Sequence, residues 1–409
     1  VSLESTDGGV RVDGAVALTG ASDLTTGGGI GDDISVTGAI DGAFALELDA
    51  GVMGDVATDG VIGGTLALAS LDVTGASIEI GSDVTTQATQ QYTGDLTIDE
   101  AGLTSTVGGS IVFDGDVTLA GDVDVTTAGG VGDDIDLNGS VDGAQALALD
   151  SGDGDTTLGA AVGGMAALTE IDIAAANANV ASTIDVTGDL SIAADEIEFT
   201  GGVGSIEVDG TVSLSGSDAG VSIDLGSPAG GVGVLGLSGT DFAAIADGAD
   251  QIIIGHAAGT GDVTLGSLDV LDPLVVQSPG GTIAVDGDLT GSSDASFTLM
   301  APSIDLGADV VTAGGIVTLD GAVTLDADAM LDTTNGGGVA GGADITLTST
   351  VDGGHELSLD SGSTGAISLG DDAGSTTALA GLNVANTDEF TVAGSITAGT
   401  VTQLAGEGD

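Results

Sequence analysis

Short runs of alternating aliphatic and polar residues fill the chain, and glycine bounds most of them. In VDGAQALALD (141–150), Leu147 and Leu149 stand two residues apart, with Ala148 between them. Side chains two residues apart lie on one face of an extended strand, so this pattern predicts a strand with both leucines turned inward. The best helical candidate, 174–181, is broken by two asparagines. The pattern therefore predicts an all-β chain of short strands separated by turns.

The same phrase occurs four times. The other copies are IDGAFALELD (40–49), ADGADQIIIG (246–255) and VDGGHELSLD (351–360), so the Asp-Gly pairs begin at positions 41, 142, 247 and 352, at intervals of 101, 105 and 105. A long-period repeat of this kind indicates stacked or arrayed units. The four super-repeats are anchored at Asp41, Asp142, Asp247 and Asp352, and their predicted inward pairs are Leu46/Leu48, Leu147/Leu149, Ile252/Ile254 and Leu357/Leu359.

A period near 100 residues divides into five turns of roughly 20 residues, which is a plausible circuit for a β-solenoid. The predicted fold is a right-handed parallel β-solenoid (β-helix) of about 20 turns, formed by residues 1–409 as one continuous repeat region. Tandem immunoglobulin-like β-sandwiches are the alternative, because their modules also contain about 100 residues. After the first Asp-Gly pair, TLALASLDV supplies four more inward candidates: Leu66, Leu68, Leu71 and Val73.

Four longer stretches resemble a known family. They are GGGIGDDISVTGAIDGAFALELDAG from Gly27, TTQATQQYTGDLTI from Thr85, HAAGTGDVTLGSLDVLDPLVVQSPGGTIAVDG from His256 and DITLTSTVDGGHELSLDSG from Asp344. These stretches are similar to repeats of giant secreted bacterial β-strand-repeat proteins of the filamentous-haemagglutinin-like adhesin type. The resemblance implies a right-handed parallel β-solenoid, export across the outer membrane, and a role as adhesin, matrix or surface fibre. It carries no catalytic residues.

Composition narrows the nature of the core and of the partners. With 75 Gly, no Cys, no Trp, one Tyr and six Phe, the chain must bury Val, Ile, Leu and Ala in place of aromatic rings. It has 64 acidic residues against one base, Arg11, and a formal charge of −63. Nucleic acid and anionic membrane surfaces are therefore poor partners, and none is expected, because binding them relies on Lys and Arg. No apolar run is long enough to span a bilayer, so membrane insertion is not expected.

Calcium is the candidate ligand suggested by carboxylates in glycine-rich turns. GGIGDD (28–33) and GGVGDD (129–134) approach the GGxGxD part of a calcium-binding nonapeptide. Two further carboxylate clusters offer oxygens that hard cations prefer. Exposed turn carboxylates without a specific site remain the other interpretation. The complete candidate set is Asp32, Asp33, Asp133, Asp134, Asp150, Asp153, Asp155, Asp371 and Asp372.

Enzyme chemistry is not expected. Parallel β-helices often cleave acidic polysaccharides with a pair of carboxylates, but holding an anionic sugar requires Arg or Lys, and Arg11 stands alone near one end. His256 and His355 lie beside predicted strand starts, where a surface position is favoured over a catalytic or metal-binding role. No catalytic or cofactor-binding residue is assigned.

The pattern, the charge and the resemblance together predict a structural extracellular protein. In this hypothesis the chain is a β-solenoid building block of a surface fibre, sheath or adhesin stalk. It associates with itself, or continues within a longer parent chain, through open solenoid ends and lateral faces. Because the chain opens at Val1 without a leader, a mature or excised chain is expected. The alternatives are a carbohydrate- or receptor-binding adhesin module that contacts surface glycans and, less favoured, a polysaccharide-active enzyme.

Overall fold

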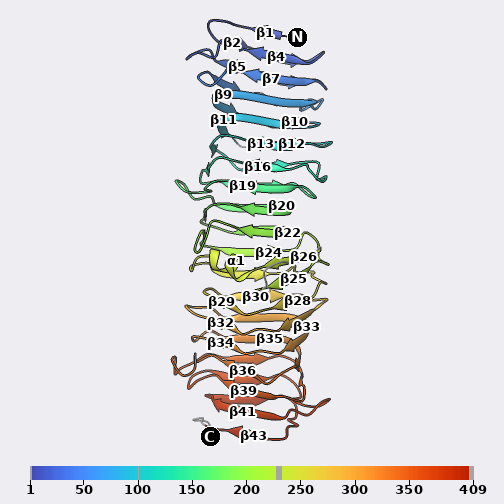
Figure 1. Ribbon diagram of the computed structural model, residues 1–409, viewed down its shortest axis with the longest axis vertical. Helices are drawn as coiled ribbons and strands as arrows, with labels where there is room; N and C mark the ends of the chain where they lie inside the picture. Colours follow the sequence, from blue (N-terminus) through green and yellow to red (C-terminus); the bar gives the residue numbers. More distant parts are fainter. Residues whose placement is uncertain (1, 100, 227–232, 405–409) are drawn as a thin grey trace. The chain divides into compact units, whose positions relative to one another are not determined.

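The computed structural model describes residues 2–99, 101–226 and 233–404. It is almost entirely β, and its parallel strands stack to form a β-solenoid of about 18 turns (Figure 1). Strands that follow one another in the sequence lie on different faces, and a strand in the middle of a ladder pairs with the strand one turn earlier and the strand one turn later. The predicted parallel solenoid is confirmed. The alternative of immunoglobulin-like sandwiches is wrong, because sandwiches are built from antiparallel ladders.

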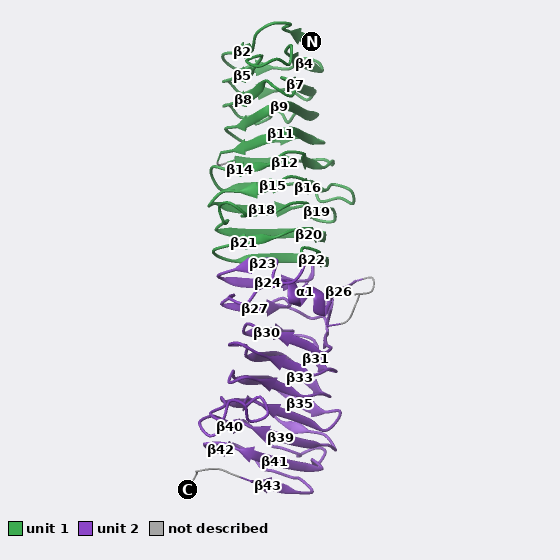
Figure 2. Cartoon of the chain, turned by 60° about the vertical axis from the view of Figure 1, so that its left-hand side comes forward, with its two compact units in different colours: residues 1–201 green, residues 202–409 purple. Residues whose placement is uncertain are grey.

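Contacts divide the chain into two compact units, Val1–Gly201 (unit 1) and Gly202–Asp409 (unit 2), which are coloured separately in Figure 2. In unit 1 the strands form three parallel ladders, one on each face of the turn. The long strands β9 (Ser70–Ile80), β11 (Gln90–Ile98), β20 (Glu170–Val180) and β22 (Leu190–Phe199) belong to two ladders each, because they continue around a corner.

The ladder of face 1 contains β1 (Ser2–Glu4), β4 (Ser22–Thr25), β7 (Ala45–Asp49), β9 (Ser70–Ile80), β11 (Gln90–Ile98), β13 (Ile111–Phe113), β16 (Ile135–Leu137), β19 (Asp155–Leu158), β20 (Glu170–Val180) and β22 (Leu190–Phe199). Face 2 contains β2 (Val10–Val12), β5 (Ile34–Val36), β8 (Asp55–Thr58), β9, β11, β14 (Val117–Leu119), β17 (Val141–Asp142) and β21 (Ile184–Val186). Face 3 contains β3 (Val16–Ala17), β6 (Ile40–Asp41), β10 (Val84–Thr86), β12 (Ala101–Ser105), β15 (Val123–Thr126), β18 (Ala146–Asp150), β20 and β22.

Alternation along each strand fills the core, as the pattern predicted. All eight inward positions of the four phrases are buried, and buried apolar side chains stack between turns: Leu48 of β7 pairs with Val73 of β9, and Val73 with Tyr92 of β11. The ring of Tyr92 stacks on Phe113 of the following turn, with centroids 5.4 Å apart. Leu68, Leu71 and Val73 are also buried. The prediction for Leu66 is wrong: it is 52% exposed, because it lies in a corner turn between strands.

The super-repeat does not contain a whole number of turns. On face 3 of unit 1, Ile40 stacks successively on Ile62, Val84, Leu103 and Val125, which completes four turns. Val141 takes the place of Ile40 in the next copy of the phrase. After Val125 on face 3, the chain passes along face 1 and reaches Val141 on face 2, where Val141 stacks on Val117. The repeat from Asp41 to Asp142 therefore spans four and two-thirds turns, and the prediction of five turns is wrong for it. Within unit 1 the second copy of the phrase presents its side chains one face away from the first.

Unit 2 repeats this design. One ladder contains β24 (Thr211–Ser215), β27 (Gln251–Ile254), β30 (Leu274–Gln277), β33 (Phe297–Leu306), β35 (Val317–Leu325), β37 (Ile345–Leu347), β40 (Ala366–Leu369) and β42 (Glu389–Val392). The second contains β26 (Val234–Leu237), β25 (Ser222–Leu225), β28 (Val263–Leu265), β31 (Thr282–Val285), β33, β35 and β38 (Val351–Asp352). The third contains β29 (Leu268–Val270), β32 (Leu289–Gly291), β34 (Val310–Thr312), β36 (Ala329–Asp332), β39 (Glu356–Asp360), β41 (Gly381–Asn386) and β43 (Val401–Gln403). The short strand β23 (Ile206–Val208) precedes β24 in the sequence.

An insertion interrupts the regular turns of unit 2. Thr211 of β24 pairs with Gln251 of β27, and the chain between them is longer than a regular turn because it adds β26 and the helix α1 (Gly239–Ala244). Ser238 and Asp241 form a capping box that starts α1, and the side chain of Phe242 is buried beneath it. The sequence pattern predicts no helix at this point. In the described part of the chain, no helix has the length and hydropathy required to cross a membrane.

Candidate functional site

The aspartate of the Asp-Gly phrase links one turn to the next. The Oδ1 atom of Asp142 accepts hydrogen bonds from the backbone N–H groups of Met165 (2.7 Å) and Ala166 (3.2 Å), one turn further on. Asp41 and Asp352 accept the same pair of bonds at their own corners. The backbone N–H of Thr65 is the main reason why the pKa of Asp41 lies below its ordinary value. These three aspartates act as structural caps of the corners.

The glycine of the phrase is needed where the previous turn passes close by. Gly143 has φ +136°, a conformation that side chains with Cβ rarely adopt, and a Cβ atom there would lie 2.3 Å from the carbonyl oxygen of Leu119. Gly42 and Gly353 have the same close contact with a leucine carbonyl. Gly248 of the third copy has φ +137°, but a Cβ atom there would have no neighbour within 4 Å. The third copy therefore keeps the backbone turn without the close packing.

The predicted calcium-binding aspartates at 32–33 and 133–134 accept hydrogen bonds from backbone N–H groups of their own turn and of adjacent turns. Asp32 accepts hydrogen bonds from Gly8 (2.7 Å) and Gly29 (2.9 Å) N–H groups. Asp133 accepts the equivalent bonds from Gly109 and Gly130. Asp33 and Asp134 accept from the N–H groups of Asp55 and Asp155. The turns themselves use these carboxylates, and calcium binding at them stays a prediction.

The other predicted carboxylates are also spread over turns. Asp150 accepts from the N–H of Gly152, Asp155 accepts from the side-chain amide of Asn177, and Asp153 lies on the surface of its turn. Asp371 accepts from the N–H of Asp372. Asp372 accepts from both the N–H and the hydroxyl of Ser395, and these bonds hold its pKa below the ordinary value.

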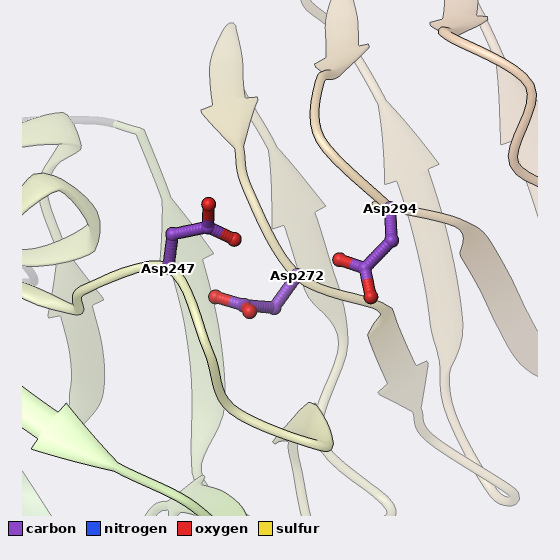
Figure 3. A group of neighbouring side chains, drawn as sticks. All are labelled: Asp247, Asp272 and Asp294. Carbon is purple, nitrogen blue, oxygen red and sulfur yellow. The ribbon is translucent and has the colours of Figure 1, made fainter.

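The third copy brings three carboxylates together. Asp247 precedes β27, Asp272 lies between β29 and β30, and Asp294 lies between β32 and β33, so three successive corner loops of unit 2 each contribute one aspartate. One oxygen of each carboxylate lies within 4.8 Å of the others, and Figure 3 shows the three side chains gathered at this corner. We name Asp247, Asp272 and Asp294 the acidic triad. Among the described residues, these three carboxylates form a group of metal-ligating side chains close enough together to share one metal ion.

The three members of the acidic triad have different surroundings. Asp247 and Asp294 are exposed, and the hydroxyl of Ser293 donates to both oxygens of Asp247 at 3.1 and 3.2 Å. Asp272 is only 1% exposed. Its Oδ1 accepts from the N–H of Gly248 at 2.8 Å, whereas its Oδ2 is buried without a hydrogen-bond partner. Burial raises the pKa of Asp272, and the neighbouring charges of Asp247 and Asp294 add to the increase.

A second buried aspartate shows how this fold normally satisfies such a group. Asp332, at the end of β36, is also buried, but its Oδ1 accepts from the N–H and hydroxyl of Thr334, and its Oδ2 accepts from the N–H of Gly336. Buried polar atoms in proteins nearly always have a partner. The unpaired oxygen of Asp272 is therefore an exception that calls for an explanation.

Neither Asp272 nor Asp294 is among the ligands predicted from the sequence, and Asp247 is predicted only as the anchor of a repeat. Asp272 and Asp294 lie in unrelated phrases, LDVLDPLVV and GSSDASF. The intervals from Asp247 to Asp272 and from Asp272 to Asp294 are close to the length of a solenoid turn in this region. A search for carboxylates separated by one turn could have found the triad, but only once the turn lengths were known.

The remaining charged candidates lie at the surface. Arg11 Nε donates to Asp13 at 2.8 Å, and both side chains are mostly exposed. His355 Nδ1 lies 3.6 Å from Asp328, and His256 Nδ1 accepts from the N–H of Ala258. Neither histidine belongs to the acidic triad.

Comparisons of the chain with protein-family models, with curated proteins and with solved structures gave no match. The parallel β-solenoid that the resemblance implied is present.

Proposed function

We propose that this chain is a structural protein: a β-solenoid segment of an extracellular fibre, sheath or adhesin stalk. The observation that carries this proposal is the continuity of the ladders. In unit 1 the ladder of face 1 runs from β1 to β22 without a break in parallel pairing. In a solenoid each turn is stabilised by its neighbours, so the same design extends by adding turns.

Strand edges give this segment a means of joining further turns. In the described residues β1 pairs with β4, and β43 pairs with β41, on one edge each. The N–H and C=O groups of the other edge can pair with an additional parallel strand. In this proposal that strand belongs to a longer parent chain or to a second copy.

Corner loops add lateral contacts. Ile30 and Val131 occupy the same place in two copies of the repeat and are 90% and 91% exposed, each at the tip of a glycine-rich loop. Because the second copy is displaced by one face from the first, these tips lie at different corners of the turn. Apolar tips at different corners allow one solenoid to contact several neighbours.

Electron microscopy and sedimentation velocity of the purified chain test this function. Elongated assemblies that grow with protein concentration are expected, since strand addition and lateral contact are both bimolecular. The double variant I30S/V131S should reduce lateral bundling, whereas V203S, which changes another exposed valine, should not. Single short particles at every protein and calcium concentration would refute self-association.

A further inference from the structure

We propose that Asp247, Asp272 and Asp294 bind one divalent cation, and that Ca²⁺ is the ion whose chemistry fits this site best. The site lies within unit 2, outside the residues that the sequence predicted for calcium. It does not depend on whether copies of the chain associate.

Distances between the carboxylates support a single shared ion. One oxygen from each of the three side chains lies within 4.8 Å of the other two. Calcium binds oxygen ligands at roughly 2.3–2.6 Å, so two ligands of one ion are at most about 5 Å apart. An ion between the three side chains can therefore contact all of them with small side-chain movements.

The unpaired oxygen of Asp272 is the independent observation that indicates a ligand. Oδ2 of this 1% exposed residue has no hydrogen-bond donor, although the similarly buried Asp332 has donors on both oxygens. An isolated carboxylate is costly to bury, and a bound cation offsets that cost by direct coordination. Asp247 and Asp294 are exposed, so water can complete the coordination shell on the outer side.

The chemistry of the ligand set favours Ca²⁺ over Mg²⁺. Calcium accepts 6–8 oxygen ligands in irregular geometry, whereas magnesium requires a near-octahedral shell and keeps several of its waters. Three carboxylates on three separate loops, with Oδ1 of Asp272 already accepting from Gly248, form an irregular set. A proton shared between Asp272 and a neighbouring carboxylate is the competing explanation of the unpaired oxygen, and it predicts no ion binding.

The position of the triad gives the ion a structural effect. Asp247 lies directly after the insertion that contains α1, where the pairing of Thr211 with Gln251 encloses more chain than a regular turn does. The other two aspartates belong to the next two turns. An ion bound to all three would join the irregular turn to the regular ones. Binding to the folded state alone raises the unfolding temperature with ion concentration.

Isothermal titration calorimetry with CaCl₂ tests the proposal on the full chain, freed of metal by chelation, in about 150 mM NaCl so that diffuse binding by the other carboxylates is screened. We expect one saturable site per chain, with Kd in the range of roughly 10⁻⁴–10⁻³ M that is typical of extracellular modules. Mg²⁺ should bind at least tenfold more weakly. D272N should weaken Ca²⁺ binding at least tenfold and remove the increase in unfolding temperature caused by Ca²⁺.

D247N and D294N change exposed members of the triad, so they test the site even if D272N does not fold, and each should weaken binding severalfold. The controls are D59N and D124N, which change exposed carboxylates outside both the triad and the predicted calcium-binding set and should leave the saturable site intact. Three outcomes would overturn the proposal: no saturable site in the wild type, equal affinity in the wild type and all three triad variants, or an unfolding temperature of the wild type that Ca²⁺ does not change.

Discussion

The corners at Asp142 and Asp247 begin with the same dipeptide and nearly the same glycine conformation, yet they do different things. At Asp142 the carboxylate accepts two backbone N–H groups of the next turn, and Gly143 packs against the carbonyl of Leu119. At Asp247 the carboxylate faces two other carboxylates, and Gly248 has open space around it. Asp41 and Asp352 follow the first arrangement.

The difference shows where this fold leaves room for chemistry. In the regular corners a ligand would compete for the capping carboxylate with backbone donors of the adjacent turn. The insertion before Asp247 changes the chain that lies beside the corner, and the hydroxyl of Ser293 donates to this aspartate instead. Variants at the two corners can separate the structural role from the ligand-binding role.

The largest difference is expected between G143A and G248A. Both force alanine into a positive φ conformation, which costs about 1–3 kcal/mol. Only G143A also drives a Cβ atom into the Leu119 carbonyl, which adds about 1–3 kcal/mol as the turns separate. Urea unfolding followed by circular dichroism should give a clearly lower midpoint for G143A. Equal midpoints would contradict the close packing at the regular corners.

Removal of the carboxylates should give the next largest difference. D142A leaves the N–H groups of Met165 and Ala166 without their acceptor, and we expect a local loss of about 2 kcal/mol. D247A removes one of three neighbouring negative charges and, without divalent ions, should be neutral or slightly stabilising. Hydrogen exchange at residues 165 and 166 measures the first effect directly. Unchanged exchange in D142A would show that water replaces the cap.

A smaller effect concerns pH in the absence of divalent ions. The pKa of Asp272 is raised above the ordinary 3.8, mainly by burial. At a pH between 3.8 and the raised pKa, the folded protein therefore binds more protons at this residue than the unfolded chain does. The contribution of this residue to stability therefore increases as the pH falls through the raised pKa. The pKa of Asp41 and of Asp372 is lowered, so their contribution is present above 3.8 and is lost as the pH falls through the lowered values.

The expected profile is a small rise in the unfolding temperature as the pH falls from about 7 through the raised pKa of Asp272, and a fall in strong acid. Asp72, Asp136 and Asp172 also have pKa values raised by burial, so the wild type alone does not isolate Asp272. The difference in this profile between the wild type and D272N isolates the contribution of Asp272. An identical rise in D272N would remove Asp272 as a contributor.

Alternation of aliphatic and polar residues predicted the strands and most of the core, with Leu66 as an exception. The inward side chains of all four phrases are buried, because period two specifies which face of a strand is apolar. The number of turns per repeat could not be obtained this way. Leu46 pairs with Leu71, and Leu71 pairs with Gln90, so the second of these turns is shorter than the first because its corner loops are shorter. The assumption that all turns have equal length was wrong.

The candidate site was harder to predict for the same reason. GGIGDD suggested calcium by its composition, but Asp32 accepts hydrogen bonds from Gly29 of its own loop and Gly8 of the turn before. The acidic triad depends on which loops stack, and that follows from turn lengths and from an insertion whose helix the periodicity did not reveal. The solenoid predicted as one continuous region stays a prediction, since contacts define two compact units.

Engineered disulfides test the register of the turns most directly, because the chain contains no cysteine. Asp124 of β15 and Ala148 of β18 are parallel partners on outward positions, and cross-strand neighbours lie within the Cα separation that a disulfide accepts. Mild oxidation of D124C/A148C should give an intramolecular bond in nearly every molecule, detected by mass spectrometry. D124C/A144C, which fits five equal turns per repeat, should stay reduced. Efficient bonding of the second pair in place of the first would contradict the stacking and the displacement of the second repeat by one face.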